Sequence, residues 1–381
     1  MTKENQSGEH ENVSRTRPRL IAFYLPQYHP IPENDEWWGK GFTEWTNVVK
    51  AKPLFKGHYQ PHLPADLGFY DLRVPEVREQ QAQLAREAGI EGFCYWHYWF
   101  AGKRLLERPF DEVLASGKPN FPFCLAWANE SWKGIWHGAD GRTLIEQTYP
   151  GAEDYTSHFD EVLPAFLDPR YITIDERPVF VLYKYALIPD LRGFVSLWRE
   201  LALQSGLKGI YFLGMRSSDN LVQPSCLDGW IVDNFYFLMK KYKNQKRSPL
   251  RSLVSRLTNG KVKLDFSNLT HRPTTIPYCE LASSDLLPLN IYLDEFPLVF
   301  PSWDNTPRSG HQGDVLRDAL PDLFQAQLHA ALEQLAHRPQ EKQIVFIKSW
   351  NEWAEGNYLE PDQKYGRSYL NAIRDQLESM N

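Results

Sequence analysis

The chain has 381 residues, of which 42% are hydrophobic and 24% charged, the balance of an ordinary globular protein. Its formal net charge of −6 gives no general attraction to nucleic acid or to anionic lipid, so no nucleic-acid partner is expected. The sequence contains no apolar run of about 18 residues, and therefore no membrane-spanning helix is expected.

The N-terminal residues 1–17 are polar and mixed in charge, and they lack the apolar segment of a secretory signal. We expect a disordered tail there, followed by a single catalytic domain over residues 18–381. The cysteines form no CxxC or Cys/His cluster, so we interpret them as reduced core residues of a cytoplasmic protein. They are Cys94, Cys124, Cys226 and Cys279.

Short apolar runs rich in aromatic and β-branched residues recur along the chain, and several are almost continuously apolar, as expected of parallel strands buried on both faces. We predict eight strands, at residues 20–29, 92–100, 121–129, 178–185, 209–216, 229–235, 296–303 and 343–350. Helical patterns lie between most of them, at residues 74–88, 153–167, 190–205, 314–337 and 364–378. Pro75 suits the first turn of the first helix, and Gly89 suits the position after its end.

Strands that alternate with helices in this way predict a (β/α)8 barrel of the TIM type. A doubly wound open sheet is the main alternative, although no glycine-rich phosphate loop follows any predicted strand. Two long insertions interrupt the pattern, over residues 30–72 after the first strand and over 239–288 after the sixth.

The second insertion begins with a basic segment, because residues 239–264 include nine lysines and arginines and no acidic residue. Its apolar residues recur at helical spacing. The segment is either a solvated insertion or a patch that contacts an anionic glycan, a lipid-linked pyrophosphate or an anionic membrane surface.

Catalytic and binding groups of such a barrel gather at the carboxyl ends of the strands. All tryptophans except Trp198 and Trp230 fall at these ends or in the loops that follow. This crowding favours a saccharide groove, because an indole covers the apolar face of a sugar while polar side chains bind its hydroxyls, although any one ring could equally be core packing. The candidate stacking residues are Trp99, Trp127, Trp303 and Trp350, and the candidate polar contacts are Tyr24, Gln27, His29, Glu44, His62, His97, Asn129, Asp233 and Asn351.

Two carboxylates follow the last predicted strand, in the run Trp350-Asn351-Glu352-Trp353-Ala354-Glu355. If the chain turns helically there, Glu352 and Glu355 lie on one side of the turn and face one small volume. Glycoside chemistry needs one carboxyl that holds a proton near neutral pH and another that is ionised or accepts a proton. The alternative is a solvated helix start, where acidic residues interact favourably with the helix dipole.

Several histidines also lie near the strand ends, but they show no HxH or HExxH spacing. We therefore expect no metal and no other cofactor. These histidines are His29, His58, His62 and His97.

Five stretches of the chain resemble WbsX-type proteins, which occur in bacterial O-antigen and capsule clusters and are named as glycosyltransferases. The stretches are FYLPQYHP (23–30), WWGKGFTEWTNV (37–48), GHYQPH (57–62), GFCYWHYW (92–99) and WANE (127–130). That family is similar to glycoside hydrolase family 99, the endo-α-mannosidases and endo-α-mannanases, which are (β/α)8 barrels. The resemblance runs from about residue 20 to residue 369.

The resemblance implies roles for the two glutamates, because family 99 uses a pair separated by two residues after the last strand, and Glu352 and Glu355 match that spacing. Carried over, Glu355 would be the acid/base on the glycosidic oxygen, and Glu352 would be the base toward the 2-hydroxyl of the sugar. The reaction would pass through a 1,2-anhydro sugar with retention. We expect the indoles and the charge of Glu352 to raise the pKa of Glu355. Ala354 departs from the hydrolase pattern, so the resemblance does not extend to mannose specificity.

Taken together, these features predict an enzyme that acts on glycosidic bonds of a bacterial surface polysaccharide or of its precursor, which could be lipid-linked. Retaining hydrolysis or transglycosylation is the first hypothesis. The second is a glycosyltransferase of O-antigen or lipopolysaccharide biosynthesis, although the chain shows no DxD-like metal motif. The third is a non-catalytic barrel that binds glycans.

Overall fold

The structure is a computed structural model that describes residues 17–134, 142–216, 224–233, 235, 238–239, 242, 272–280 and 294–380. Nearly all of the expected N-terminal tail and of the basic segment 239–264 lies outside these residues.

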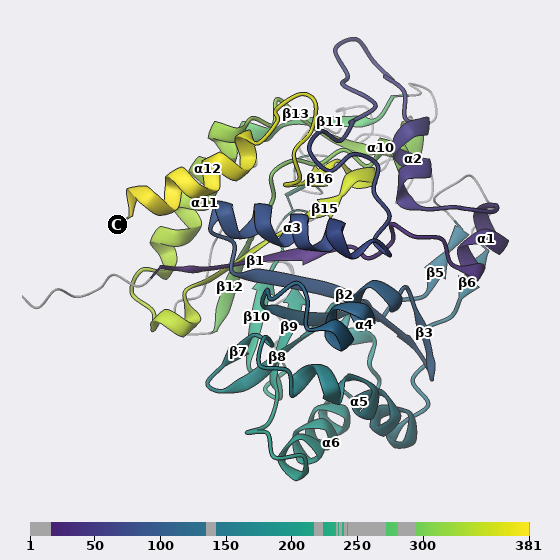
Figure 1. Cartoon of the computed structure of the whole chain (residues 1–381), viewed down its shortest axis with the longest axis vertical. Helices are drawn as coiled ribbons and strands as arrows, with labels where there is room; N and C mark the ends of the chain where they lie inside the picture. The colour runs from purple at the N-terminus through teal and green to yellow at the C-terminus, as the bar shows by residue number, and fades with distance from the viewer. Residues whose placement is uncertain are drawn as a thin grey trace, which may run out of the picture.

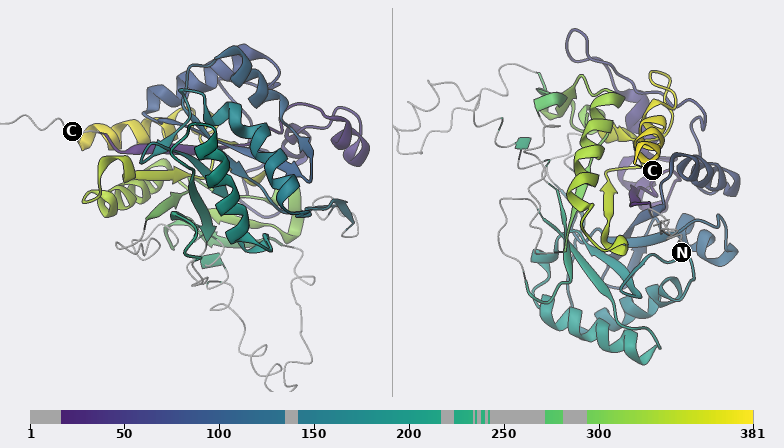
Figure 2. Two further views of the ribbon diagram at one scale, coloured as in Figure 1. Left: turned by 90° about the horizontal axis from the view of Figure 1, so that it is seen from below. Right: turned by 90° about the vertical axis from the view of Figure 1, so that its left-hand side faces the viewer.

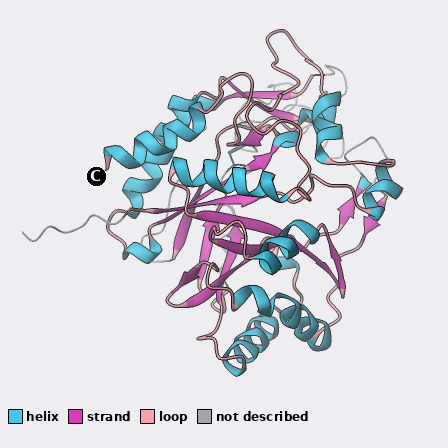
Figure 3. Cartoon of the chain, viewed as in Figure 1, coloured by secondary structure: helices cyan, strands magenta, loops and turns pink. Residues whose placement is uncertain are grey.

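A closed cylinder of parallel strands forms the centre of the molecule (Figure 1 and Figure 3). Each strand pairs with its neighbours in chain order, and the first strand pairs both with the second and with the last, which closes the barrel. The (β/α)8 prediction is confirmed, and the open sheet is excluded by this closure. The eight strands are β1 (Arg19–Tyr24), β2 (Gly92–Phe100), β4 (Phe123–Trp127), β8 (Arg177–Leu182), β9 (Tyr211–Arg216), β10 (Gly229–Val232), β12 (Glu295–Val299) and β14 (Ile344–Ile347).

Longer helices surround the strands, as the two views of Figure 2 show. α5 and α6 pack against each other, as do α11 and α12. In the helix α3, Pro75 occupies the first turn, and Gly89, at φ +88°, lets the chain leave the helix in the left-handed region, as predicted. The helices are α3 (Pro75–Ala88), α4 (Arg108–Ser116), α5 (Ala152–Phe166), α6 (Leu191–Gln204), α11 (Pro321–Leu335) and α12 (Ser368–Ser379). No helix in the described part of the chain is long and apolar enough to cross a bilayer.

Smaller elements gather at the carboxyl ends of the strands, on the side of Figure 1 toward which β1 and β2 point. The short helices there are α1 (Pro32–Trp38), α2 (Glu44–Lys50), α10 (Thr306–Ser309) and the single turn η7 (Trp353–Glu355). Two small hairpins accompany them, β5 (Trp132–Lys133) with β6 (Thr143–Ile145) and β15 (Asn351–Glu352) with β16 (Asn357–Tyr358). The remaining elements are β3 (Lys103–Leu105), β7 (Thr173–Ile174), β11 (Thr274–Pro277), β13 (Asp314–Arg317), η2 (Tyr185–Leu187), η3 (Tyr278–Glu280), η5 (Gly310–Gln312) and η6 (Gln340–Lys342).

One predicted helix, 314–337, is wrong over its first part. Residues 314–317 are instead the strand β13, which pairs with β11, and Asp318 then takes φ +58°, which no helix interior tolerates. The helix α11 begins only at Pro321, where a proline fits the first turn. A pairing partner about forty residues away, such as β11, leaves no trace in local periodicity.

The cysteines are partly as expected. Cys94 and Cys124 are buried and face each other in register on β2 and β4. Cys226 is half-buried and Cys279 is exposed on the short helix η3, so the expectation of a core position is wrong for Cys279. All four are described, and none forms a disulfide.

Aromatic rings fill the layer between the barrel and the helices α5 and α6. Trp198 on α6 is fully buried, and its ring centroid lies 4.8 Å from that of Phe180 on β8 and 5.0 Å from that of His158 on α5. Its indole N–H donates to the carbonyl of Tyr155 at 3.0 Å. The ring therefore joins two helices to the barrel wall.

We predict that Trp198→Ala lowers the free energy of unfolding by about 3–5 kcal/mol, because the cavity left behind cannot be filled by neighbouring rings. Urea denaturation followed by circular dichroism measures this change. Leu203→Ala on the same helix is the matched control: its side chain is 62% exposed, so its effect should stay within about 0.5 kcal/mol. Equal effects of the two substitutions would contradict the assignment of Trp198 to the core.

Candidate active site

Two glutamates meet where the last barrel strand ends. After β14 the chain forms the hairpin strand β15 and the single turn η7, and Glu352 and Glu355 stand at the two ends of that turn. Both are nearly buried, at 9% and 8% exposed, and both line a cavity of about 420 Å³. Their carboxyl groups are hydrogen-bonded to each other. The structure thus brings the pair to one cavity.

The position of the turn is fixed by close backbone packing. Gly356, which follows the turn, has φ +59°, and a Cβ atom there would lie 2.8 Å from the backbone nitrogen of Asp304. That nitrogen donates to the carbonyl of Glu355 at 2.7 Å. On the other side, the Asn351 side chain accepts from the backbone N–H of Leu25 at 2.8 Å and donates to its carbonyl at 3.0 Å. Asn351, a candidate sugar contact, is therefore a buried link between the end of β1 and the turn.

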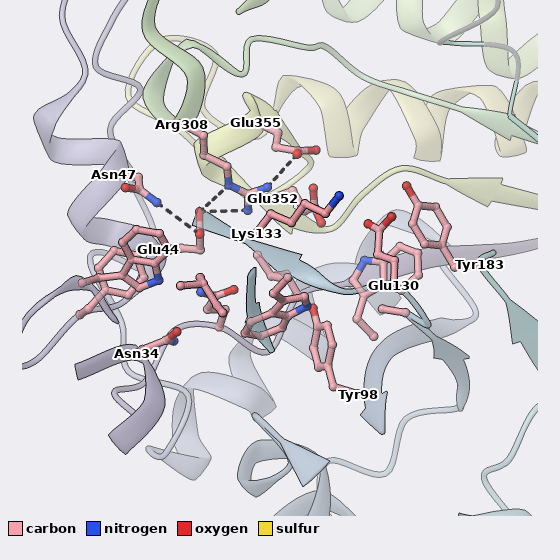
Figure 4. A pocket seen from close by; sticks show the side chains of 18 of the residues that line it. Asn34, Glu44, Asn47, Tyr98, Glu130, Lys133, Tyr183, Arg308, Glu352 and Glu355 are labelled. Atoms are coloured by element: carbon pink, nitrogen blue, oxygen red, sulfur yellow. Dashed lines mark hydrogen bonds and ion pairs between the residues drawn. The ribbon is translucent and has the colours of Figure 1, made fainter. Parts of the chain in front are cut away.

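Arg308 is the cation of the site. Its guanidinium donates to Glu355 at 2.7 Å and lies 3.0 Å from a carboxylate oxygen of Glu44 on α2 (Figure 4). Burial alone would raise the pKa of Glu355, but the charges of Arg308 and Lys348 and the hydrogen bond from Glu352 outweigh it, so the pKa of Glu355 is lowered. Glu355 is therefore ionised at neutral pH.

Glu352 behaves in the opposite way. Burial and the charge of Glu355 raise its pKa well above the ordinary value, and Arg308 and Lys348 compensate only in part. The opposite shifts and the hydrogen bond between the carboxyls favour the proton on Glu352 and the charge on Glu355. The expected raised pKa of Glu355 is wrong, because the Arg308 guanidinium binds that carboxylate and nothing in the local sequence singles Arg308 out.

A buried carboxylate sets the position of Arg308. Asp304 accepts from the backbone N–H of Thr306 at 3.0 Å, which begins the short helix α10 that carries Arg308. Its other oxygen accepts from His58 Nε2 and Gln60 Nε2, each at 2.7 Å. His58 Nδ1 accepts from a backbone N–H, so Nε2 carries the proton. The insertion after β1 thereby reaches across the barrel mouth and holds α10.

The remaining walls combine aromatic and polar side chains (Figure 4). Rings flank the carboxyl pair on several sides, and Lys348 reaches the cavity from the end of β14. The aromatic lining residues are Trp38, Phe42, Trp96, Tyr98, Trp132 and Tyr183, and the polar ones besides the pair and Arg308 are Gln27, Asn34, Glu44, Asn47, Glu130, Ser131, Lys133 and Lys348.

Of the predicted polar contacts, Gln27 and Glu44 line the cavity. The others bind protein groups instead. Tyr24 donates to Gln81 at 2.7 Å, His29 contacts the carbonyl of Pro26 at 3.0 Å, and His62 contacts the hydroxyl of Tyr358 at 2.7 Å.

Two further predicted contacts support the site from behind. The Asn129 side chain accepts from the backbone N–H of Lys184 at 2.7 Å and donates to its carbonyl at 3.0 Å, which joins the loops after β4 and β8. Asp233 accepts from Lys348 Nζ at 3.2 Å. Asp233 thus keeps a cation beside the carboxyl pair without lining the cavity itself.

Side chains along β2 point alternately to the two faces of the strand, and this decides which of them reach the cavity. Trp96 and Tyr98 line it, whereas His97 and Trp99 point toward α5, where both rings stack on His158. Burial lowers the pKa of His97 to about 3, so it is neutral at physiological pH. His97 and Trp99, which we expected to contact a sugar, therefore face the core. The residues of β2 that line the cavity are Trp96 and Tyr98, each one position earlier in the chain.

The other proposed stacking tryptophans are also core residues. Trp127, Trp303 and Trp350 are at most 1% exposed, and none lines the cavity. Trp127 packs on α5 and α6, Trp303 on Phe235 and Trp350 on Phe93. Such buried rings offer no face to a ligand.

Sequence reasoning missed Arg308, Lys348, Asn34 and Asn47. Lys348 could have been found, because it is a charged residue that directly follows the apolar strand β14. Arg308 lies on the four-residue helix α10, which is too short to leave a periodic pattern in the sequence. Among the described residues, no group of three or more His, Cys, Asp or Glu side chains is arranged to hold a metal ion.

Comparison with protein families gives one match over most of the chain. The family model described as Glycosyltransferase WbsX matches residues 20–373. WxcX of Xanthomonas campestris pv. campestris is 39% identical over 360 residues, a match that covers 94% of this chain and 49% of WxcX, and WxcX of strain B100 gives the same values. The chain therefore spans about half the length of the curated relatives it matches.

Solved structures share the fold at low sequence identity. A glycoside hydrolase-like protein superposes with a TM-score of 0.56 at 15% identity, over 95% of this chain and 94% of that one. The GH99 endo-alpha-mannosidase from Bacteroides thetaiotaomicron gives a TM-score of 0.55 at 16% identity, over 95% and 97% of the two chains. Both comparisons place the chain among barrels of this architecture.

We predict that Arg308→Gln lowers the free energy of unfolding by about 3–5 kcal/mol at neutral pH, because Glu44 and Glu355 lose their shared cation while buried. Without it, the pKa of both carboxyls in the folded state rises: that of Glu44, already raised by burial, rises further, and that of Glu355 loses the charge that lowers it. The loss of stability should therefore grow as the pH rises above the unfolded-state pKa and fade as the pH falls below it. Urea unfolding at a series of pH values measures this dependence.

The control is Arg374→Gln on α12, whose partly exposed side chain pairs with the adjacent Asp375. It should change stability by less than about 0.5 kcal/mol at any pH. A loss in Arg308→Gln that does not vary with pH would point to packing instead of charge.

Proposed function

The chain belongs to the WbsX glycosyltransferase family, and on that premise we propose that it acts on glycosidic bonds of a bacterial surface polysaccharide, with Glu352 and Glu355 as the reacting carboxyls. The observation that carries the proposal is the meeting of two buried, mutually hydrogen-bonded carboxyls in a cavity walled by aromatic rings, with their pKa values shifted in opposite directions. One protonated and one ionised carboxyl is the arrangement that acid/base chemistry at a glycosidic bond requires. The cavity volume of about 420 Å³ is in the range of small-molecule sites.

The proton must change place before the roles implied by the resemblance can be filled. In the resting pair the proton lies on Glu352 and Glu355 is ionised. When the substrate enters, the proton passes through their hydrogen bond to Glu355, and Arg308 pairs more fully with Glu44. Glu352 is then an ionised base and Glu355 a neutral acid. Transfer of one proton thus prepares both carboxyls for the first step.

The reaction then proceeds in two balanced steps. Glu352 takes the proton of the 2-hydroxyl as that oxygen bonds to the anomeric carbon, and Glu355 protonates the departing glycosidic oxygen. In the second step Glu355 takes a proton from the acceptor, whose oxygen opens the 1,2-anhydro sugar, and Glu352 returns its proton to the 2-oxygen. Two inversions at the anomeric carbon give net retention.

The acceptor distinguishes hydrolysis from transfer. Water yields hydrolysis, and a sugar hydroxyl yields transglycosylation in the same cavity. The description of the family supports transfer, so a glycosyltransferase that uses a lipid-linked or nucleotide-activated donor is the second candidate. Turnover of such a donor, with no cleavage of the finished polysaccharide, would favour it.

We predict that Glu352→Gln and Glu355→Gln each abolish turnover while retaining glycan binding, because each substitution removes a titrating group and keeps the shape of the side chain. Bacterial O-antigen and capsule oligosaccharides are incubated with each variant, and the products are analysed by mass and anomeric configuration. Glu333→Gln on α11, whose side chain is 68% exposed, is the control and should turn over normally. Binding without turnover in the wild type would instead support a glycan-binding barrel.

We also predict a bell-shaped pH dependence of kcat/KM. Activity falls at low pH when the pair takes up a second proton, and this limb lies below the ordinary carboxyl range because the pKa of Glu355 is lowered. It falls at high pH when the pair loses its only proton, and this limb lies above that range because the pKa of Glu352 is raised. The two apparent values belong to the pair.

Arg308→Gln should move the acid limb to higher pH, since it removes the cation that keeps Glu355 ionised. The measurement is made where the variant is folded, with Arg374→Gln as the control. An unchanged acid limb would show that Arg308 does not control the pKa of Glu355 in the active enzyme.

A further inference from the structure

Two asparagines at one end of the cavity have side-chain amide atoms with no hydrogen-bond partner among the described residues. Asn34 on α1 is fully buried, and neither its Nδ2 nor its Oδ1 has a hydrogen-bond partner in the described part of the chain. Asn47 on α2 is 3% exposed, its Oδ1 has none, and its Nδ2 makes only a long contact of 3.4 Å to Glu44. Buried amides without partners are unfavourable and rare in native proteins. Both residues line the cavity, so a ligand bound there would supply the missing hydrogen-bond partners.

Aromatic rings stand beside the asparagines. Trp38 and Phe42 line the same cavity, and their ring centroids are 6.0 Å apart. Trp132 lines it as well and is held edge-on by Tyr98, at 5.1 Å between centroids. Such rings can cover the apolar face of a sugar while the amides bind its edge.

This part of the wall is held in place before any ligand arrives. The backbone N–H of Gly41 donates to Asp35 at 2.7 Å, which folds the turn after α1 back on the helix and positions Phe42. Glu33 at the start of α1 pairs with Lys103 on β3 at 2.6 Å. A preformed wall loses little conformational entropy on binding.

The unpaired amide atoms indicate which groups of a ligand they can bind. Two unpaired oxygens, Asn34 Oδ1 and Asn47 Oδ1, need hydrogen-bond donors, and Asn34 Nδ2 needs an acceptor. A carboxylate or a phosphate offers no donor. An uncharged sugar offers both kinds of group, through neighbouring hydroxyls or through the N–H and C=O of an acylamino substituent.

We propose that Asn34 and Asn47, with Trp38 and Phe42, form a second sugar subsite beside the carboxyl pair, and that this subsite binds an uncharged sugar residue. In Figure 4 Asn34 and Asn47 lie at one end of the view with Glu44, and Glu130 and Tyr183 lie at the other, with Glu352 between them. The subsite rests on the proposed function, and it implies that the enzyme acts within an oligosaccharide of at least two residues.

The test measures binding in a Glu352→Gln background, so that it does not depend on turnover. The probes are the methyl glycosides of glucose, galactose, mannose, N-acetylglucosamine and N-acetylgalactosamine, and the readouts are saturation-transfer NMR and tryptophan fluorescence. We expect at least one probe to bind, and Asn34→Leu to weaken that binding at least tenfold. Leucine has a similar shape and removes an unpaired amide, so the variant should be no less stable than its parent.

Asn371→Leu at an exposed position of α12 is the matched control and should bind as its parent does. If Asn34→Leu does not fold, Asn34→Ala gives the same test, because it removes the amide without adding bulk. Binding confined to the two N-acetyl sugars assigns the acylamino group, and binding of the other sugars assigns hydroxyls.

Two results would overturn the subsite. One is that no probe binds the parent, and the other is that Asn34→Leu binds as tightly as its parent. Turnover that fails in the wild type while the probes bind through Asn34 would refute the proposed reaction and leave the subsite standing.

Discussion

Arg308 joins three parts of the chain that are far apart in sequence: α2 in the insertion after β1, α10 in the loop after β12, and η7 after β14. Without it, the negative charges of Glu44 and Glu355 would repel each other in a buried volume where neither is well solvated, and ionisation of both would be strongly unfavourable. The same guanidinium decides which carboxyl is ionised. The arrangement of the barrel mouth and the chemistry of the pair therefore have one origin.

The barrel could be predicted from sequence because its signal is local. Each strand is a nearly continuous apolar run, and burial on both faces makes such runs stand out wherever they occur. The turn at Glu352 and Glu355 could be predicted for the same reason, since it directly follows the last of these runs. The strand β13 could not be predicted, because it forms only through its pairing with β11.

The residues around the carboxyl pair were harder to assign, and the reason is geometric. Successive residues of a barrel strand face opposite ways, so a shift of one position exchanges a cavity residue for a core residue. On β2 the sequence does not say that Trp96 faces the cavity and that Trp99 stacks on His158. Abundant aromatic residues thus serve two purposes in this molecule: some line the cavity, and others hold the helices α5 and α6 on the barrel.

The last strand, β14, lies between β12 and β1, and the two glutamates follow it within eight residues. During synthesis the cylinder therefore stays open until the same short stretch that closes it also delivers the carboxyls. A nascent chain that stops before this point has neither a sealed wall nor the carboxyl pair that we propose acts on a glycan. Closure of the barrel and completion of the proposed catalytic pair therefore depend on the same short stretch of chain.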